Sequence, residues 1–265
     1  MRRVIRVVES LRLFTSNSFK KVPFELGDMY INKEEVVFAL DQIYADLVDN
    51  AVTYMRLFDN IPNEYKEFRK YLPSFIKSFK EGSSCIVVIR KDPGMILLKD
   101  ILNFYGGSLD PKHVAWILSS LYNLCCYLQF MGSCHNDISL NSYFISPEFH
   151  TGALLGGWWY ATKIGEKIKG VPARTYAILP QNMKDNKLQQ KIIDLILVKK
   201  LGREMLIGKP APEPLVNWLE TPTSGDVLND YTTWRGEIID QAFGGKFFTP
   251  MNLKADQIYK EGLSI

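Results

Sequence analysis

The chain has 265 residues, of which 46% are apolar and 23% charged, a composition typical of a globular protein with one large domain or two lobes sharing an interface. Its net charge of +3 is too small to indicate nucleic acid or an anionic membrane as an obligatory partner. No apolar run approaches the ~18 residues that span a bilayer. We therefore expect a cytoplasmic protein that binds neither nucleic acid nor membrane.

The basic start of the chain, MRRVIRVVESLRLF, is interrupted by Glu9 and Arg12, which argues against a secretory signal. The cysteines lack the C-x-x-C spacing of zinc sites, so we expect buried free thiols in a reducing compartment. They are Cys85, Cys125, Cys126 and Cys134.

Residues 1–32 alternate short apolar runs with polar breaks, which predicts short strands or irregular structure. From residue 33 to residue 60, apolar side chains such as Val37, Leu40 and Leu47 fall at helical spacing, and the sequence predicts one long helix. Residues 72–90 then predict a hairpin with a Gly-Ser turn at 82–84 and a buried second strand.

After Pro93 and Gly94 the sequence becomes mainly helical. A short helix is predicted within residues 95–107, and a long helix over 111–131 begins with Asp110 as its N-cap and Pro111 at its first position. Two short strands should follow, over 142–146 and 152–157, and then helices over 185–208 and 228–244. These patterns divide the chain into residues 1–91 and 92–265.

Several segments resemble protein kinases in the same order. CIVVIRKDPGMILLKDIL resembles their strand, hinge and first C-lobe helix, and helix 111–131 before GSCHND resembles the helix that leads to their catalytic loop. KIIDLILVKKLGREMLIG is similar to their central C-lobe helix, with Asp194 at the position of its buried aspartate. The resemblance covers about residues 70–210. It implies an α+β, protein-kinase-like bilobal fold with a reduced or irregular N-lobe, a mainly helical C-lobe and a catalytic-loop-like segment at 133–146.

The resemblance also implies catalytic residues. The kinase loop reads H-R-D-x-x-x-x-N, in which the aspartate accepts the substrate hydroxyl proton and the asparagine holds metal. His135 and Asp137 match this pattern, Ser142 stands in the asparagine's place, and Asn141 lies one position early. Asp137 is therefore either a catalytic base or a loop aspartate that binds backbone N–H groups. His135 would join the loop to the segment around Gly156, and Asn141 would be the metal ligand.

The same alignment shows departures from the kinase pattern. The metal-binding D-F-G aligns with Gly156, Gly157 and Trp158, which offer no hard oxygen ligand to magnesium. A G-x-G-x-x-G loop is absent, and the lysine that pairs with nucleotide phosphates would be Lys33 or Lys21. Trp158 and its aromatic neighbours either fill the nucleotide cleft, present a hot spot to a partner, or pack the lobes together.

Basic side chains fall where a kinase would dock its substrate, and they are otherwise expected to line a solvated loop. They are Lys163, Lys167, Lys169 and Arg174.

We therefore expect a degenerate pseudokinase that acts as a binding, regulatory or scaffolding module for a protein partner. The alternative is a divergent Ser/Thr-kinase-like phosphotransferase with Asp137 as base and non-standard metal ligation. ATP and magnesium are the cofactors implied for an active enzyme, and a pseudokinase needs neither. A third hypothesis is a component of a larger assembly. The chain is similar to divergent phage kinase-like proteins, which implies the host cytoplasm or the virion as its location if it is viral.

Overall fold

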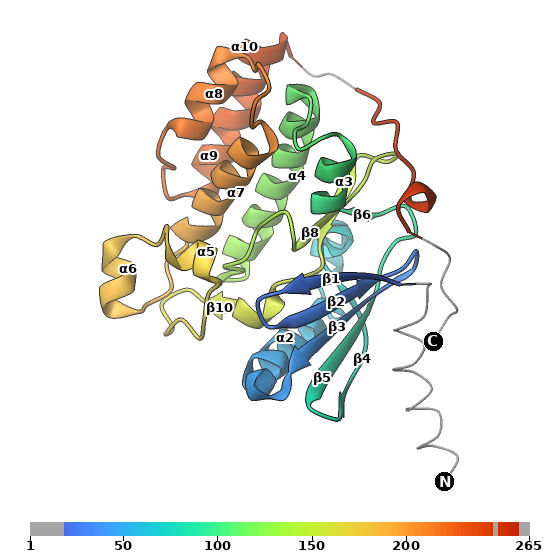
Figure 1. Ribbon diagram of the computed structural model, residues 1–265. Coiled ribbons are helices and arrows are strands. Elements are labelled where there is room, and N and C mark those ends of the chain that lie inside the picture. Colours follow the sequence, from blue (N-terminus) through green and yellow to red (C-terminus); the bar gives the residue numbers. More distant parts are fainter. Residues whose placement is uncertain (1–18, 246–248, 260–265) are drawn as a thin grey trace.

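The computed structural model describes residues 19–245 and 249–259. It is an α+β structure in which a five-strand antiparallel sheet is followed by a largely helical region (Figure 1). The apolar runs predicted within residues 1–18 lie outside the described residues. Among the described helices, none is long and apolar enough to cross a membrane.

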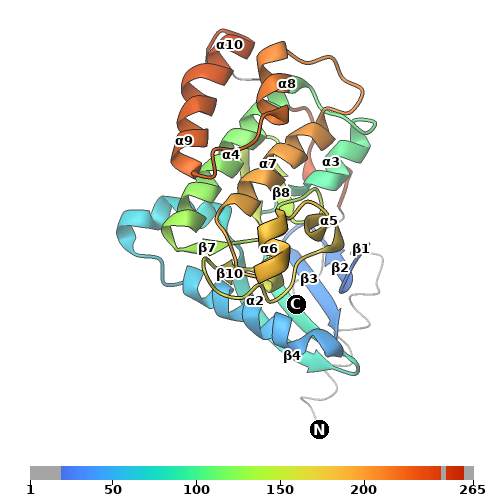
Figure 2. The same ribbon diagram turned by 90° about the vertical axis from the view of Figure 1, so that its left-hand side faces the viewer.

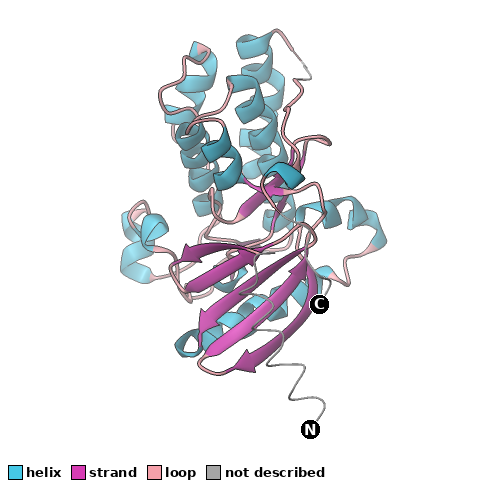
Figure 3. Ribbon diagram, turned by 45° about the vertical axis from the view of Figure 1, so that its right-hand side comes forward, coloured by secondary structure: helices cyan, strands magenta, loops and turns pink. Residues whose placement is uncertain are grey.

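The sheet has the strand order β1-β2-β3-β5-β4, and one helix, α2, packs against one of its faces (Figure 3). The elements are β1 Lys20–Phe24, β2 Gly27–Ile31, β3 Glu35–Asp41, α2 Ala45–Phe58, β4 Ser74–Glu81 and β5 Ser84–Arg90. The predicted hairpin of residues 72–90 is confirmed as the pair β4–β5, joined by a turn at Gly82 and Ser83.

The single long helix predicted over residues 33–60 is wrong in its first half. Residues 35–41 form β3, the central strand, whose side chains are buried on both faces of the sheet. Val36, Phe38 and Leu40 face the main core, while Val37 faces a smaller cluster on the other side. A strand buried on both faces gives a continuous apolar run, and such a run also satisfies a helical spacing.

The helical region is built around α4 and α7, which pack against each other (Figure 2). The predicted start of α4 is confirmed: the Asp110 carboxylate accepts the Lys112 N–H at 2.8 Å, and Pro111 is the first helical residue. The helices are α3 Leu98–Phe104, α4 Pro111–Phe130, α5 Ala173–Tyr176, α6 Gln181–Asn186, α7 Ile192–Met205, α8 Glu213–Glu220, α9 Val227–Thr233 and α10 Ile239–Phe243.

Short strands and 3-10 turns connect the two regions. β6 and β9 flank β8 in one small sheet, and β7 pairs with β10 in another. The strands are β6 Ile96–Leu97, β7 Ser133–Cys134, β8 Tyr143–Ser146, β9 Thr151–Leu154 and β10 Thr162–Lys163. The loop of residues 135–142 leaves β7 and enters β8, so it lies where the helical region meets the sheet. The four cysteines are free thiols; Cys85, Cys125 and Cys134 are buried, as predicted, whereas Cys126 is half-buried.

Candidate functional site

The loop that carries Asp137 is held in place by a side chain of α7. The buried Asp194 carboxylate accepts the backbone N–H of His135 at 2.7 Å and that of Asn136 at 2.9 Å. Asn136 has a φ of 68°. Its side-chain amide donates to the Tyr160 carbonyl at 2.9 Å and exchanges hydrogen bonds with the Gln189 amide. Burial raises the pKa of Asp194 to about 6. Side chains of this chain therefore satisfy the backbone N–H groups at the start of the loop.

His135 joins this loop to the segment after β9. Its Nε2 lies 2.9 Å from the Gly156 carbonyl oxygen, and its Nδ1 accepts the Asp137 N–H at 3.2 Å. Those partners assign the proton to Nε2 in the neutral ring. Burial lowers the pKa of His135 to about 3, so the ring stays neutral near pH 7. This is the structural role that the sequence suggested for His135.

Asp137 is buried and paired with a cation. Its carboxylate forms an ion pair with Arg174 from α5 and accepts the Ser139 hydroxyl at 3.3 Å. Arg174 also donates to the Ser139 oxygen at 2.8 Å. Burial raises the pKa of Asp137 to about 6, and the Arg174 charge opposes that rise. From the sequence, Arg174 was expected in a solvated or substrate-docking loop. The structure instead turns it inward, onto the carboxylate predicted to be the base.

Gly157 allows the next segment to approach this loop. Gly157 has a φ of +84°, and a Cβ there would lie 2.5 Å from the His135 ring and 2.8 Å from the Asp137 carboxylate. Only glycine tolerates both the backbone conformation and the contact. Here, the position aligned with the metal-binding motif carries a backbone turn against Asp137 and no ligand side chain.

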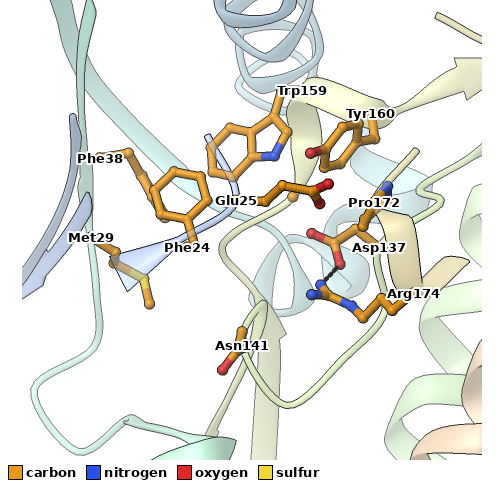
Figure 4. Close-up of a pocket in the computed structure, with 11 residues that line it drawn as sticks. Phe24, Glu25, Met29, Phe38, Asp137, Asn141, Trp159, Tyr160, Pro172 and Arg174 are labelled. Atoms are coloured by element: carbon orange, nitrogen blue, oxygen red, sulfur yellow. Dashed lines mark hydrogen bonds and ion pairs between the residues drawn. The ribbon is translucent and has the colours of Figure 1, made fainter. Parts of the chain in front are cut away.

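The two tryptophans after Gly157 face different surroundings. Trp158 is fully buried, donates its indole N–H to the Leu154 carbonyl at 2.8 Å, and packs on Phe58 and His135. Trp159 points into the space between the sheet and the loop (Figure 4). Its ring stacks on that of Phe24, with 5.2 Å between the ring centres, and meets the Phe38 ring edge-on, with 5.0 Å between the ring centres. The sequence offered Trp158 and its aromatic neighbours for a cleft, and Trp158 as a cofactor-binding residue. In the structure Trp159 and Tyr160 line the cavity, and Trp158 does not.

The cavity that remains beside these rings is small. It has a volume of about 30 Å³, which is room for about two water molecules. Asp137, Asn141, Glu25, Tyr160 and Arg174 line it together with the aromatic rings (Figure 4). Ligand pockets usually measure about 300–1,000 Å³. In this form the cavity is therefore too small for a nucleotide.

The remaining predicted residues divide between this cavity and other places. Asn141 lines the cavity, whereas the Ser142 hydroxyl accepts the Ser139 N–H at 3.0 Å and donates to the Asp137 carbonyl, which closes the loop on itself. Lys33 lies in the turn between β2 and β3. Lys21 lies on β1 with its ammonium 2.9 Å from the Asp28 carboxylate. Neither lysine lines the cavity.

The donor set around Asp137 does not fit a magnesium ion as arranged. Asp137 already pairs with Arg174, and the Glu25 carboxylate accepts the Ala173 N–H at 3.3 Å. Within residues 19–245 and 249–259, no three His, Cys, Asp or Glu side chains come together as a metal site requires. A guanidinium beside the carboxylate repels a second cation.

Sequence reasoning missed Asn50, which holds the aromatic segment to the sheet side of the molecule. From α2, its side-chain amide donates to the carbonyls of Trp159 at 3.2 Å and Ala161 at 2.9 Å. The Lys169 ammonium donates to the Asn50 oxygen at 2.6 Å. A buried polar residue on the inner face of the predicted helix was the available signal.

No protein-family model matches this chain, and no curated protein matches its sequence.

Proposed function

We propose that this chain is a protein-kinase-like domain that has lost phosphoryl transfer and acts as a binding or scaffolding module for a protein partner. Support for the kinase-like part comes from the order of the elements. A five-strand sheet with α2 inserted between β3 and β4 precedes a helical region, and the loop after α4 rests on the buried Asp194. In kinases that loop carries the catalytic aspartate.

The observation that carries the loss of activity is the position of Trp159. Its ring occupies the space between the sheet and the Asp137 loop, stacked on Phe24 and in contact with Phe38. A kinase needs this kind of space for its nucleotide, with a lysine on the third strand and a carboxylate for magnesium. Strand β3, EVVFALD, contains no lysine, and Phe38 on that strand packs against Trp159.

The ion pair between Asp137 and Arg174 also supports the proposed loss of phosphoryl transfer. A catalytic base must accept a proton from a substrate hydroxyl at hydrogen-bond distance. Arg174 and Ser139 both contact the Oδ1 atom of this carboxylate, and Gly157 packs so close to Oδ2 that a Cβ there would lie 2.8 Å from it. Phosphoryl transfer depends mostly on positioned charge around the phosphate. The charges here neutralise each other within the chain.

One observation favours the alternative, a divergent phosphotransferase. Asp137 and Asn141 line the same cavity, and a pKa of about 6 suits a general base near neutral pH. That function requires Trp159 to leave the cleft and Arg174 to release Asp137 before a nucleotide enters.

The deciding experiment is thermal unfolding of the full chain with and without millimolar ATP, each in the presence and absence of magnesium. A phosphate-transfer assay accompanies it. A ligand at ~100 times its dissociation constant stabilises by about 2.7 kcal/mol, which raises the midpoint by roughly 5 °C or more. We expect no shift and no transfer. A magnesium-dependent shift with transfer that Asp137→Asn abolishes would establish the phosphotransferase instead.

Trp159→Ala is the companion variant, because it removes the ring that closes the cleft. We expect a less stable protein that still transfers no phosphate, since Arg174 and the missing β3 lysine remain. Trp218→Ala is the matched control. Trp218 lies on α8, is 9% exposed, donates its indole N–H to the Tyr122 hydroxyl at 3.1 Å, and does not line the cavity beside Trp159. ATP binding gained by Trp159→Ala alone would show that the indole ring is the barrier to the nucleotide.

A further inference from the structure

A second, larger hollow is lined by Glu25 of the β1–β2 turn and by residues of α5, α6 and the segment before α5. Helices α5 and α6 lie close together at one side of the helical region (Figure 2). Its volume is about 420 Å³, within the range of small-molecule sites. We call it the α5–α6 groove. Its lining residues are Glu25, Ile168, Gly170, Val171, Ala173, Tyr176, Leu179, Met183, Lys184 and Lys187.

The floor and walls of this groove are apolar. Met183 and Leu179 are buried beneath it, and Ile168 and Val171 are half-buried along its side. Tyr176 is 57% exposed at its edge, a large aromatic side chain open to water. When the apolar body of a ligand displaces water from a concave apolar surface of this size, the free energy of the system falls, which favours binding.

The charges at the groove are separated between its two ends. Lys184 and Lys187 lie at the α6 end, and the Lys184 ammonium sits 5.5 Å from the centre of the Tyr176 ring. Among the described residues, neither lysine has a carboxylate within ion-pair distance. The acid at the other end, Glu25, accepts the Ala173 N–H. An anion is therefore favoured beside α6 and disfavoured beside the β1–β2 turn.

We propose that the α5–α6 groove binds a small amphipathic carboxylate. Its apolar body lies on Met183, Leu179 and Ile168, and its carboxylate reaches Lys184 and Lys187. The opposed charges of Glu25 and the lysines fix its direction in the groove. This site does not overlap the cavity beside Trp159 except at Glu25, so it stands whether or not the chain transfers phosphate.

The test is titration calorimetry on the full chain with octanoate as the probe. Three ligands separate the parts of the proposal: 1-octanol has the tail alone, acetate has the head alone, and octylammonium has the opposite charge. We expect octanoate to bind with one site per chain and to weaken as salt is raised, because the lysines are at the surface. The other three should bind at least about ten-fold more weakly, since each lacks either the apolar burial or the charge-assisted contact.

Variants locate the site. Lys184→Gln with Lys187→Gln should weaken octanoate by about ten-fold, as two charge-assisted contacts are removed. Lys209→Gln is the control, because Lys209 is an exposed lysine in the loop between α7 and α8 and does not line the groove. Ala173→Trp, at an exposed position on α5, should fill the groove and abolish binding. Unfolding midpoints of all variants confirm that each is folded.

Absence of saturable octanoate binding to the unmodified chain would overturn the proposal. So would equal binding of octanol or octylammonium, or binding that neither the lysine pair nor Ala173→Trp changes. Magnesium-dependent stabilisation by ATP together with phosphate transfer, in the experiment above, would refute the proposed loss of activity and leave this site unaffected, so the two failures are distinguishable.

Discussion

Gly157→Ala is the sharpest test of how the Asp137 loop is packed. Gly157 has a φ of +84°, where an L-residue costs roughly 1–2 kcal/mol. The added methyl group would also lie 2.5 Å from the His135 ring and 2.8 Å from the Asp137 carboxylate, and overpacking of this kind costs roughly 1–3 kcal/mol. We expect a total loss of about 2–5 kcal/mol, a large share of the ~5–15 kcal/mol that stabilises a typical domain.

Gly208→Ala is the matched control for that prediction. Gly208 has a φ of +72°, but a Cβ there meets no atom within 4 Å. Only the backbone cost applies, so we expect a loss of roughly 1–2 kcal/mol. Equilibrium urea unfolding of both variants measures the difference directly. Equal losses for the two variants would refute the close packing of Gly157 against His135 and Asp137.

Three further predictions concern buried charges, each measured by urea unfolding. Arg174→Gln should cost about 1–3 kcal/mol at pH 7 and less at pH 5, because Asp137, with a pKa of about 6, is protonated at pH 5 and needs no cation; equal losses at both pH values would contradict this. The pKa of Asp137 is raised from 3.8, so ionisation of this carboxyl destabilises the fold as the pH rises through about 6. Between pH 4 and pH 7, the free energy of unfolding of Asp137→Asn should therefore increase by up to roughly 3 kcal/mol relative to that of the unmodified chain. An unchanged difference across that range would rule out the buried carboxyl. Lys199→Met should cost about 1–3 kcal/mol, as it leaves the carbonyls of Trp218 and Thr221 without their donor, and a neutral result would show that water replaces the ammonium.

Much of the helical region could be predicted from the sequence because its signals are local. Asp110 and Pro111 mark the start of α4 through capping contacts within two residues. The β4–β5 hairpin was predictable for the same reason, since its turn joins adjacent strands. Strand β3 was not, because its burial comes from β2 and β5 on either side and from α2, and none of these is visible in the local pattern.

The site was only half predictable for a related reason. The spacing of His135 and Asp137 pointed to the loop, and Asp194 was named from its position in α7. Arg174 lies 37 residues beyond Asp137, and no sequence pattern relates the two. The choice between Trp158 and Trp159 rests on the direction of a single 3-10 turn after Gly157. A shift of one residue there would exchange the places of Trp158, which packs on Phe58 and His135, and Trp159, which lies beside the cavity.

The loop geometry itself therefore does not report on activity. Asp194 must accept two backbone N–H groups, and His135 must join Gly156, whether or not phosphate is transferred, because buried polar groups are costly when unpaired. These contacts would hold the loop in the same form in the proposed non-catalytic domain as in an active enzyme. What separates an active site from a structural one lies outside the motif. In the function proposed for this chain, the difference is the Arg174 guanidinium on Asp137 and the Trp159 ring against Phe24, and an active form would require both to move.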